Sequence, residues 1–191
     1  MRPSKTTDLV YIAMAAALLA VCSWISTPPI GTIVPFTLQT FAVFVTVGLL
    51  GPRRGTSAIF IYILLAAVGL PVLSGFKGGL GALTGPTGGY VIGFLFTAFI
   101  MDVFQLIQKK AGAPWLLILS MILGLMVCYL FGTLWFCHVY ISEEGSRMGF
   151  AAAASYCVLP YLIPDAVKII LAGLICSNKA IKRSIAPATA G

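Results

Sequence analysis

Long apolar runs separated by short polar connections dominate the chain. Five runs are almost free of charge and approach the roughly 20 residues that an α-helix needs to cross a bilayer, and a shorter sixth follows the sequence LPYLIP. The runs are residues 9–26, 33–50, 56–70, 90–107, 114–137 and 166–177. They are continuously apolar, whereas the strands of a transmembrane barrel alternate. The pattern predicts an all-α integral membrane protein, with residues 1–191 forming one six-helix transmembrane domain.

Composition removes the soluble classes of protein. Of the 191 residues, 60% are hydrophobic and 9% are charged, and the mean hydropathy is +1.04. These values lie far outside those of soluble globular domains. The first run is too long for a signal-peptide core and no clean small-residue cleavage site follows it, so we expect it to be a retained span surrounded by membrane lipid.

Basic residues gather at alternate ends of the runs, which gives the expected orientation. The other ends carry only Lys77 and Arg147, against Glu143 and Glu144. By the positive-inside rule the basic ends are cytoplasmic, so we expect both termini in the cytoplasm and read the net charge of +7 as a topology signal, with no nucleic-acid partner. The basic residues at the expected cytoplasmic ends are Arg2, Lys5, Arg53, Arg54, Lys109, Lys110, Lys179, Lys182 and Arg183.

A glycine-rich segment, GLPVLSGFKGGLGALTGPTGGY at residues 69–90, is expected to form an extracellular loop between the third and fourth helices. Glycine permits positive φ and close approach of the backbone to a ligand, and the interleaved apolar residues are unlike a flexible linker. We expect the segment to form a lid and partial wall of a binding site. The substrate contacts expected within it are Gly78, Gly79, Gly85 and Tyr90, although Tyr90 also suits an aromatic belt at the membrane interface.

An ionisable pair interrupts the last apolar run. Asp165 and Lys168 are three positions apart and share one helix face, and charges inside apolar segments usually mark a ligand or ion pathway. We expect both to bind substrate near the start of a helix that begins at Pro164; the alternative is an ion pair that only fixes helix packing. Gln39 in VPFTLQ offers donors and an acceptor to a mostly apolar pocket, or else bonds another helix.

Signatures of catalysis, metal binding and nucleotide hydrolysis are absent from the sequence. It contains neither GxSxG nor GxxxxGK[ST], and His138 has no second ligand at metal spacing. The five cysteines are dispersed without CxxC spacing. We therefore expect no enzyme activity, no cofactor and no metal, and any uphill transport would draw energy from a partner or an ion gradient.

The first run carries alanines at four-residue spacing, which lets another helix approach closely. Ala13 and Ala17 form one such pair, and Ala16 and Ala20 form another. Docking of a partner protein and packing inside the bundle both fit this pattern.

The segments GLPV…GG…L…GPTGGY and LPYLIPDAVK, with PFTLQT, resemble the BioY family, the biotin-binding S components of energy-coupling factor (ECF) transporters. The resemblance covers nearly the whole chain. It implies six helices in a prokaryotic plasma membrane, an extracellular-side biotin pocket, and delivery to the cytoplasm with a transmembrane coupling protein and two ABC ATPases. It also implies that the S component rotates in the membrane and that Ala13 and Ala17 contact the coupling protein. Phe76 and Lys77 depart from the small residues commoner in the family.

The residue chemistry agrees with biotin. Its ureido ring has two N–H donors and one acceptor, its body is apolar, and its tail ends in a carboxylate. Asp165 can accept from an N–H group, while Lys168, Gln39 or backbone amides can serve the acceptor or the carboxylate. We expect Asp165 and Lys168 to bind the ureido end, with Tyr90 and the glycine-rich segment closing over it. A stand-alone secondary transporter of a small vitamin-like molecule is the alternative.

Overall fold

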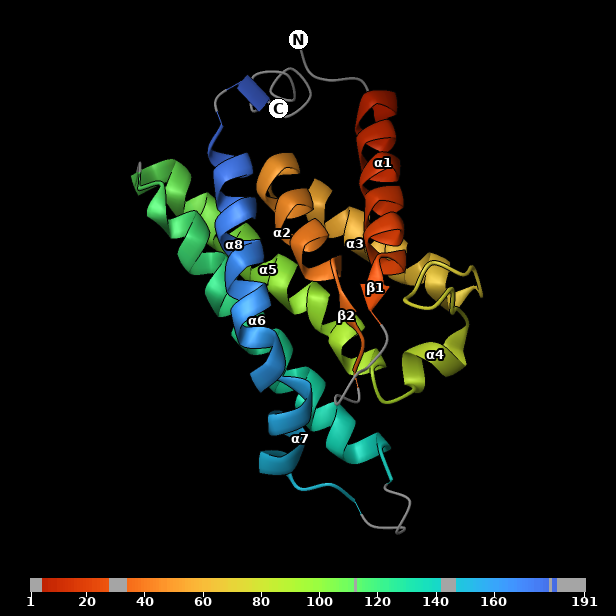
Figure 1. Ribbon diagram of the computed structural model, residues 1–191. Coiled ribbons are helices and arrows are strands. Elements are labelled where there is room, and N and C mark those ends of the chain that lie inside the picture. The colour runs from red at the N-terminus through yellow and green to blue at the C-terminus, as the bar shows by residue number, and fades with distance from the viewer. Residues whose placement is uncertain (1–4, 28–33, 112, 142–146, 179, 182–191) are drawn as a thin grey trace.

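The structure is a computed structural model that describes residues 5–27, 34–111, 113–141, 147–178 and 180–181. It is mostly helical (Figure 1). The elements are α1 (Lys5–Trp24), β1 (Ser26–Thr27), β2 (Phe36–Thr37), α2 (Gln39–Leu50), α3 (Arg54–Ala67), α4 (Leu80–Thr84), α5 (Gly88–Ala111), α6 (Trp115–Val139), α7 (Phe150–Cys157), a 3₁₀ turn η1 (Leu159–Tyr161) and α8 (Leu162–Ser177). The two short strands pair antiparallel, with Ser26 opposite Thr37.

Each of the six apolar runs contains a helix, and the described residues include four helical stretches long and apolar enough to cross a membrane. These are Thr6–Trp24, Gly88–Gln108, Trp115–Val139 and Phe150–Ser177, the last combining α7, η1 and α8. Helices α2 and α3 are apolar but have only 12 and 14 residues, or about 18 and 21 Å at 1.5 Å per residue. Both fall short of the ~30 Å hydrocarbon core.

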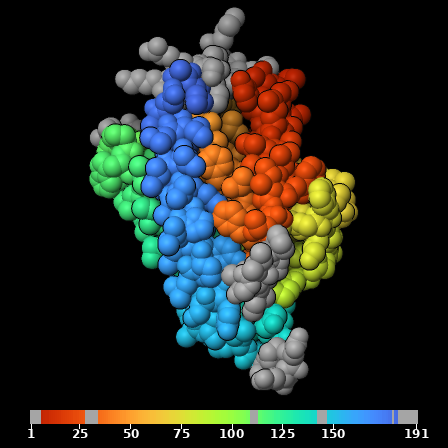
Figure 2. All heavy atoms as spheres, in the orientation of Figure 1, coloured from red at the N-terminus to blue at the C-terminus, as the bar shows by residue number. Residues whose placement is uncertain are grey.

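The helices form a bundle around α2. Helix α2 packs against α1, α3, α5 and α8, and α5 in turn runs alongside α6. Ala42, Val43, Phe44 and Val47 of α2 are almost completely buried, as expected of a helix that is apolar all round. In the space-filling view, α2 shows between α1 and α8 on one continuous face (Figure 2).

The bundle has two chemically different ends. The start of α1, the end of α2, the start of α3 and the ends of α5 and α8 lie at one end, at the top of Figure 1. There Arg54 pairs with Asp8 at 2.7 Å, and the Asp102 carboxylate accepts hydrogen bonds from Thr56 Oγ1 at 2.6 Å and the backbone N–H of Arg53 at 3.2 Å. These contacts tie α1 and α5 to the start of α3.

Several of the charged residues from which the membrane orientation is predicted lie outside the residues that the structure describes. They are Arg2, Glu143, Glu144, Lys179, Lys182 and Arg183, together with both chain termini.

The glycine-rich segment occupies the other end of the bundle and is folded. The backbone N–H of Leu73 donates to Lys77 O at 3.0 Å, which closes a reverse turn, and α4 follows it. A Cβ atom at Gly78 would lie 2.2 Å from Leu70 O. Only glycine therefore lets the segment fold back on itself there.

Trp24, the last residue of α1, holds this segment against the bundle. Its Nε1 donates to Pro71 O at 2.8 Å. Its ring stacks on that of Phe76, with the ring centroids 5.1 Å apart. The segment expected as a loop is thus a turn and a short helix fastened to α1.

The last helix begins at Leu162, two residues before the expected start at Pro164. The first backbone N–H groups of a helix have no partner within it. Pro164 therefore fits inside the first turn without losing a hydrogen bond, and the 3₁₀ turn η1 leads directly into α8.

Candidate substrate-binding site

A cavity of about 980 Å³ lies at the end of the bundle that holds the strands and the glycine-rich segment. Its wall is built from α2, the glycine-rich segment, α5, α6, α7 and α8. Its volume is at the upper end of the ~300–1,000 Å³ usual for small-molecule sites. The predicted site residues that line it are Gln39, Gly78, Gly85, Tyr90, Asp165 and Lys168.

Gly79 is the predicted substrate contact that the structure does not bring to the cavity wall. Its backbone N–H donates to Ala66 O at 2.7 Å, so it faces α3. Its φ of +90° lets the chain turn into α4. A turn at this position explains the glycine by backbone conformation.

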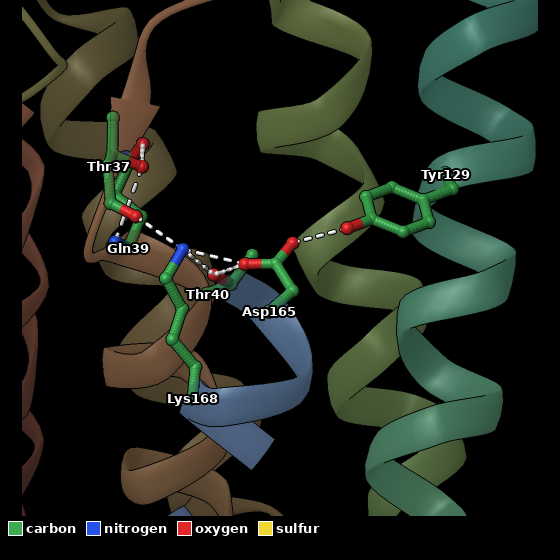
Figure 3. A network of polar contacts seen from close by, with 6 residues as sticks. All are labelled: Thr37, Gln39, Thr40, Tyr129, Asp165 and Lys168. Atoms are coloured by element: carbon green, nitrogen blue, oxygen red, sulfur yellow. Dashed lines mark hydrogen bonds and ion pairs between the residues drawn. The ribbon is translucent and has the colours of Figure 1, made fainter. Parts of the chain in front are cut away.

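Asp165 and Lys168 form a buried ion pair in the cavity wall (Figure 3). Lys168 Nζ lies 2.6 Å from Asp165 Oδ1, and the two residues are only 5% and 3% exposed. Lys168 Nζ also donates to Thr37 O at 2.6 Å and to Thr40 Oγ1 at 3.0 Å. All three ammonium donors therefore have partners within the protein.

The Asp165 carboxylate joins three helices. Oδ1 accepts from Lys168 and, at 3.0 Å, from Thr40 Oγ1 of α2. Oδ2 accepts from the hydroxyl group of Tyr129 on α6, on the opposite side from Lys168 (Figure 3). A carboxylate has about four acceptor positions, and described residues fill three of them. A buried pair needs such hydrogen bonds to offset its desolvation.

An aromatic ring completes the surroundings of the ammonium group. Lys168 Nζ lies 4.2 Å from the centroid of the Phe36 ring in β2, a favourable cation–π distance. The strand pair thus delivers both Phe36 and the Thr37 carbonyl to Lys168.

Gln39, the first residue of α2, is held by a second buried chain of hydrogen bonds. Its Nε2 donates to the hydroxyl of Tyr62 at 2.5 Å, and that hydroxyl donates to Val72 O at 3.0 Å. Thr37 Oγ1 donates to Gln39 Oε1 at 3.3 Å. Gln39 therefore both lines the cavity and bonds α3, and through Tyr62 it is connected to the glycine-rich segment.

Tyr90 lies in the first turn of α5 and packs against α6. A Cβ atom at Gly132 would come within 2.2 Å of the Tyr90 ring, so this glycine makes room for it. The Tyr90 hydroxyl shares a hydrogen bond with Thr133 at 3.1 Å, while Trp135 Nε1 donates to Gly85 O at 3.1 Å. Tyr90 and Gly85, the two predicted substrate contacts in this part of the wall, are therefore both hydrogen-bonded to α6.

Sequence reasoning did not single out four polar residues that position the site. Thr37 and Thr40 lie in PFTLQT on either side of Gln39, and Tyr62 and Tyr129 are hydroxyl-bearing residues inside apolar runs. A polar tip within an expected span is a usable signal, because it needs a partner in the membrane. Tyr129 and Asp165 are 36 positions apart, however, so their pairing depends on the tertiary arrangement.

The two alanine pairs of α1 face different ways. Ala16 and Ala20 are buried in the core, whereas Ala13 and Ala17 are exposed. The exposed pair lies among large exposed apolar residues, including Met14 and Leu18. Of the two registers, only Ala13 and Ala17 are available to another protein.

No group of three His, Cys, Asp or Glu residues that could hold a metal ion occurs within the part of the chain that the structure describes. The cavity instead offers hydrogen-bonding groups set in a largely apolar wall. This arrangement suits reversible binding of a small amphipathic molecule.

Known proteins share this sequence and architecture. The model of the family described as BioY matches residues 1–186. A biotin transporter BioY of Thermotoga maritima is 39% identical over 168 residues, covering 88% of this chain and 92% of the relative. A probable biotin transporter BioY of Pyrococcus horikoshii is 37% identical over 174 residues, covering 91% of this chain and 96% of the relative.

A solved structure is also similar to this chain. The crystal structure of the S-component for biotin from an ECF-type ABC transporter matches with a TM-score of 0.77 and 29% identity, covering 90% of this chain and 89% of that one. Their names describe transport proteins, in agreement with the prediction that this chain is a transport protein and not an enzyme. Since the family model matches nearly the whole chain and the relatives are similar over most of it, the chain belongs to the BioY family.

Proposed function

We propose that this protein is the substrate-specific S component of an ECF-type importer and that it binds biotin in the cavity described above. The observation that carries the proposal is the buried Asp165–Lys168 pair in the cavity wall, which is hydrogen-bonded to α2, the strand pair and α6. The names of the relatives and of the structural match supply the substrate.

The acceptor position left on the Asp165 carboxylate suits one N–H of the ureido ring. Gln39 Nε2 has a second hydrogen beyond the one donated to Tyr62, and it suits the ureido oxygen. The apolar bicyclic body then lies against Val91 and Phe94 of α5, which line the same cavity. An analogue that lacks a ureido N–H leaves a buried acceptor unpaired, which costs affinity.

In the membrane, the proposal includes six spans, with both termini in the cytoplasm and the cavity facing the extracellular side. Helices α2 and α3 are too short to span the membrane alone, but each is extended at the cavity end by the backbone next to it in the chain. Strand β2 precedes α2 and the glycine-rich segment follows α3, so these short helices are completed by packed protein at the cavity end. Irregular backbone is tolerated at membrane depth where protein surrounds it or a cavity adjoins it.

Energy for uptake would come from a transmembrane coupling protein and two ABC ATPases, because the chain has no nucleotide-binding motif of its own. Ala13 and Ala17 on the exposed face of α1 supply the contact with the coupling protein. Rotation of the loaded S component within the membrane would then present biotin to the cytoplasm.

Titration of the purified, lipid-embedded protein with biotin tests the substrate, read as quenching of intrinsic tryptophan fluorescence. Asp165→Asn should lower the affinity about 10- to 150-fold, the equivalent of losing a charged hydrogen bond of about 1.5–3 kcal/mol. Lys168→Met should have a similar effect.

Asp102→Asn is the matched control, since it makes the same change at the other end of the bundle. It should leave biotin affinity unchanged. Wild-type protein that binds neither biotin nor a close analogue such as dethiobiotin would refute the proposed substrate. Biotin uptake by reconstituted chain alone, driven by an ion gradient without ATPases, would instead support a secondary transporter.

A further inference from the structure

The described cavity lining contains two cations, and they differ in what they can offer a ligand. Lys168 uses all three ammonium donors on Asp165, Thr37 and Thr40. Lys77 lines the same cavity from the glycine-rich segment, and its ammonium makes no hydrogen bond or ion pair with any residue that the structure describes. Lys77 is therefore the cation with donors available to a bound molecule.

The backbone that carries Lys77 is fixed although its side chain is exposed. Its carbonyl accepts from the Leu73 N–H, and Gly78, the next residue, packs on the Leu70 carbonyl. Trp24 holds the same turn at Pro71 and Phe76. The Lys77 side chain therefore starts from a fixed backbone position at the cavity wall.

Charge in the cavity determines which end of an acid-bearing ligand this lysine meets. Asp165 is the one carboxylate among the described lining residues, and its charge is balanced by Lys168. A ligand carboxylate next to that pair would face the Asp165 oxygens and find no free ammonium donor. Next to Lys77 it would find a cation whose three donors are not taken up by any residue that the structure describes.

We propose that Lys77 binds the carboxylate of the substrate and thereby selects the free acid over its neutral amides and esters. The proposal rests on the proposed function, because it takes a biotin-like molecule with its ring system at Asp165 and its acidic tail at the glycine-rich segment.

The ratio of affinities for biotin and biotinamide, measured on the same lipid-embedded protein, tests this assignment. Biotinamide keeps the ring and chain length and replaces the carboxylate by a neutral group. Wild type should favour biotin about fivefold, as expected of a largely exposed ion pair. Raising the salt concentration to 0.5 M should reduce this preference through screening.

Lys77→Met should bring the ratio close to one while leaving affinity for biotinamide unchanged, which also shows that the variant is folded. Lys77→Arg should preserve the preference. Arg147→Met is the control for overall charge, because Arg147 lies just before α7 and is not part of the described cavity lining; it should preserve the preference too.

A preference that persists in Lys77→Met, or that Arg147→Met abolishes equally, would overturn the assignment, as would equal binding of both ligands by wild type. If all variants bind biotinamide and biotin tightly but without preference, the proposed substrate stands and only the role of Lys77 fails. If wild type binds neither ligand, the proposed function fails and this assignment fails with it.

Discussion

The Trp24 indole at the end of α1 stacks on the Phe76 ring at the tip of the turn in the glycine-rich segment, with the centroids 5.1 Å apart and the planes at 27°. Together with the hydrogen bond from Trp24 Nε1 to Pro71 O, this contact joins the helix that exposes Ala13 and Ala17 to the segment that lines the cavity. A shift of α1 would therefore act directly on the cavity wall.

Trp24→Ala should loosen the segment, since it removes an aromatic pair and a hydrogen bond, each worth about 0.5–1.5 kcal/mol. We expect faster amide hydrogen exchange over residues 70–78 and faster biotin dissociation. Trp24→Phe keeps a ring but loses the N–H donor, so its rates of amide exchange and biotin dissociation should lie between those of Trp24→Ala and wild type. Unchanged exchange in Trp24→Ala would contradict the role given to this contact.

Tyr129→Phe should destabilise the folded protein by about 1.5–3 kcal/mol, because it removes a hydrogen bond to a buried carboxylate. Thermal unfolding in detergent, with and without biotin, measures the effect. Tyr156→Phe makes the same change at an exposed position of α7 and should have almost no effect. Equal stability of the two variants would show that the Tyr129 hydroxyl does not support Asp165.

Leucine substitutions in α1 should separate partner docking from internal packing. Ala17→Leu adds bulk on the exposed face, so it should reduce co-purification with the coupling protein and leave biotin binding intact. Ala16→Leu adds the same bulk to the core, where Ala16 is 3% exposed, and should cost about 1–3 kcal/mol of stability through overpacking. Normal co-purification of both Ala13→Leu and Ala17→Leu would exclude this face as the docking surface.

Gly132→Ala should weaken biotin binding by displacing Tyr90, because the new Cβ atom would lie 2.2 Å from its ring. We expect a stability loss of about 1–3 kcal/mol as well. Gly149→Ala is the matched control, since a Cβ atom there meets nothing within 4 Å. The comparison requires biotin titration and thermal unfolding of both variants, and equal behaviour would show that Tyr90 can shift without consequence.

The apolar runs predict the helices because, in a membrane, the backbone N–H and C=O groups of each run must hydrogen-bond to one another. They do not predict that α2 begins only at Gln39, within its run, or that α3 ends at Ala67, before its run does. Those boundaries depend on tertiary structure: Phe36 and Thr37 pair with β1 just before α2, and Ala66 O at the end of α3 accepts from the Gly79 N–H.

The site was predictable where its chemistry is local. Asp165 and Lys168 share a helix face at three-residue spacing, and the structure pairs them. Thr40 and Tyr129 bind the same carboxylate from 125 and 36 positions away. Such contacts between distant segments cannot be predicted from local residue spacing. Gly79 shows the reverse case, because a glycine required by backbone conformation looks the same in sequence as one that lies against a ligand.

The neutrality of the Asp165–Lys168 pair has an electrical consequence for a protein proposed to rotate in the membrane. Moving one elementary charge through a membrane potential involves about 2.3 kcal/mol per 100 mV. The buried pair sums to zero, so its displacement requires no such work. An anionic substrate would add one negative charge, and a carboxylate bound to the Lys77 ammonium would again total zero. The voltage across the membrane would then neither drive nor oppose the loaded movement through the charges of this site, and that step would depend on the proposed ATPases.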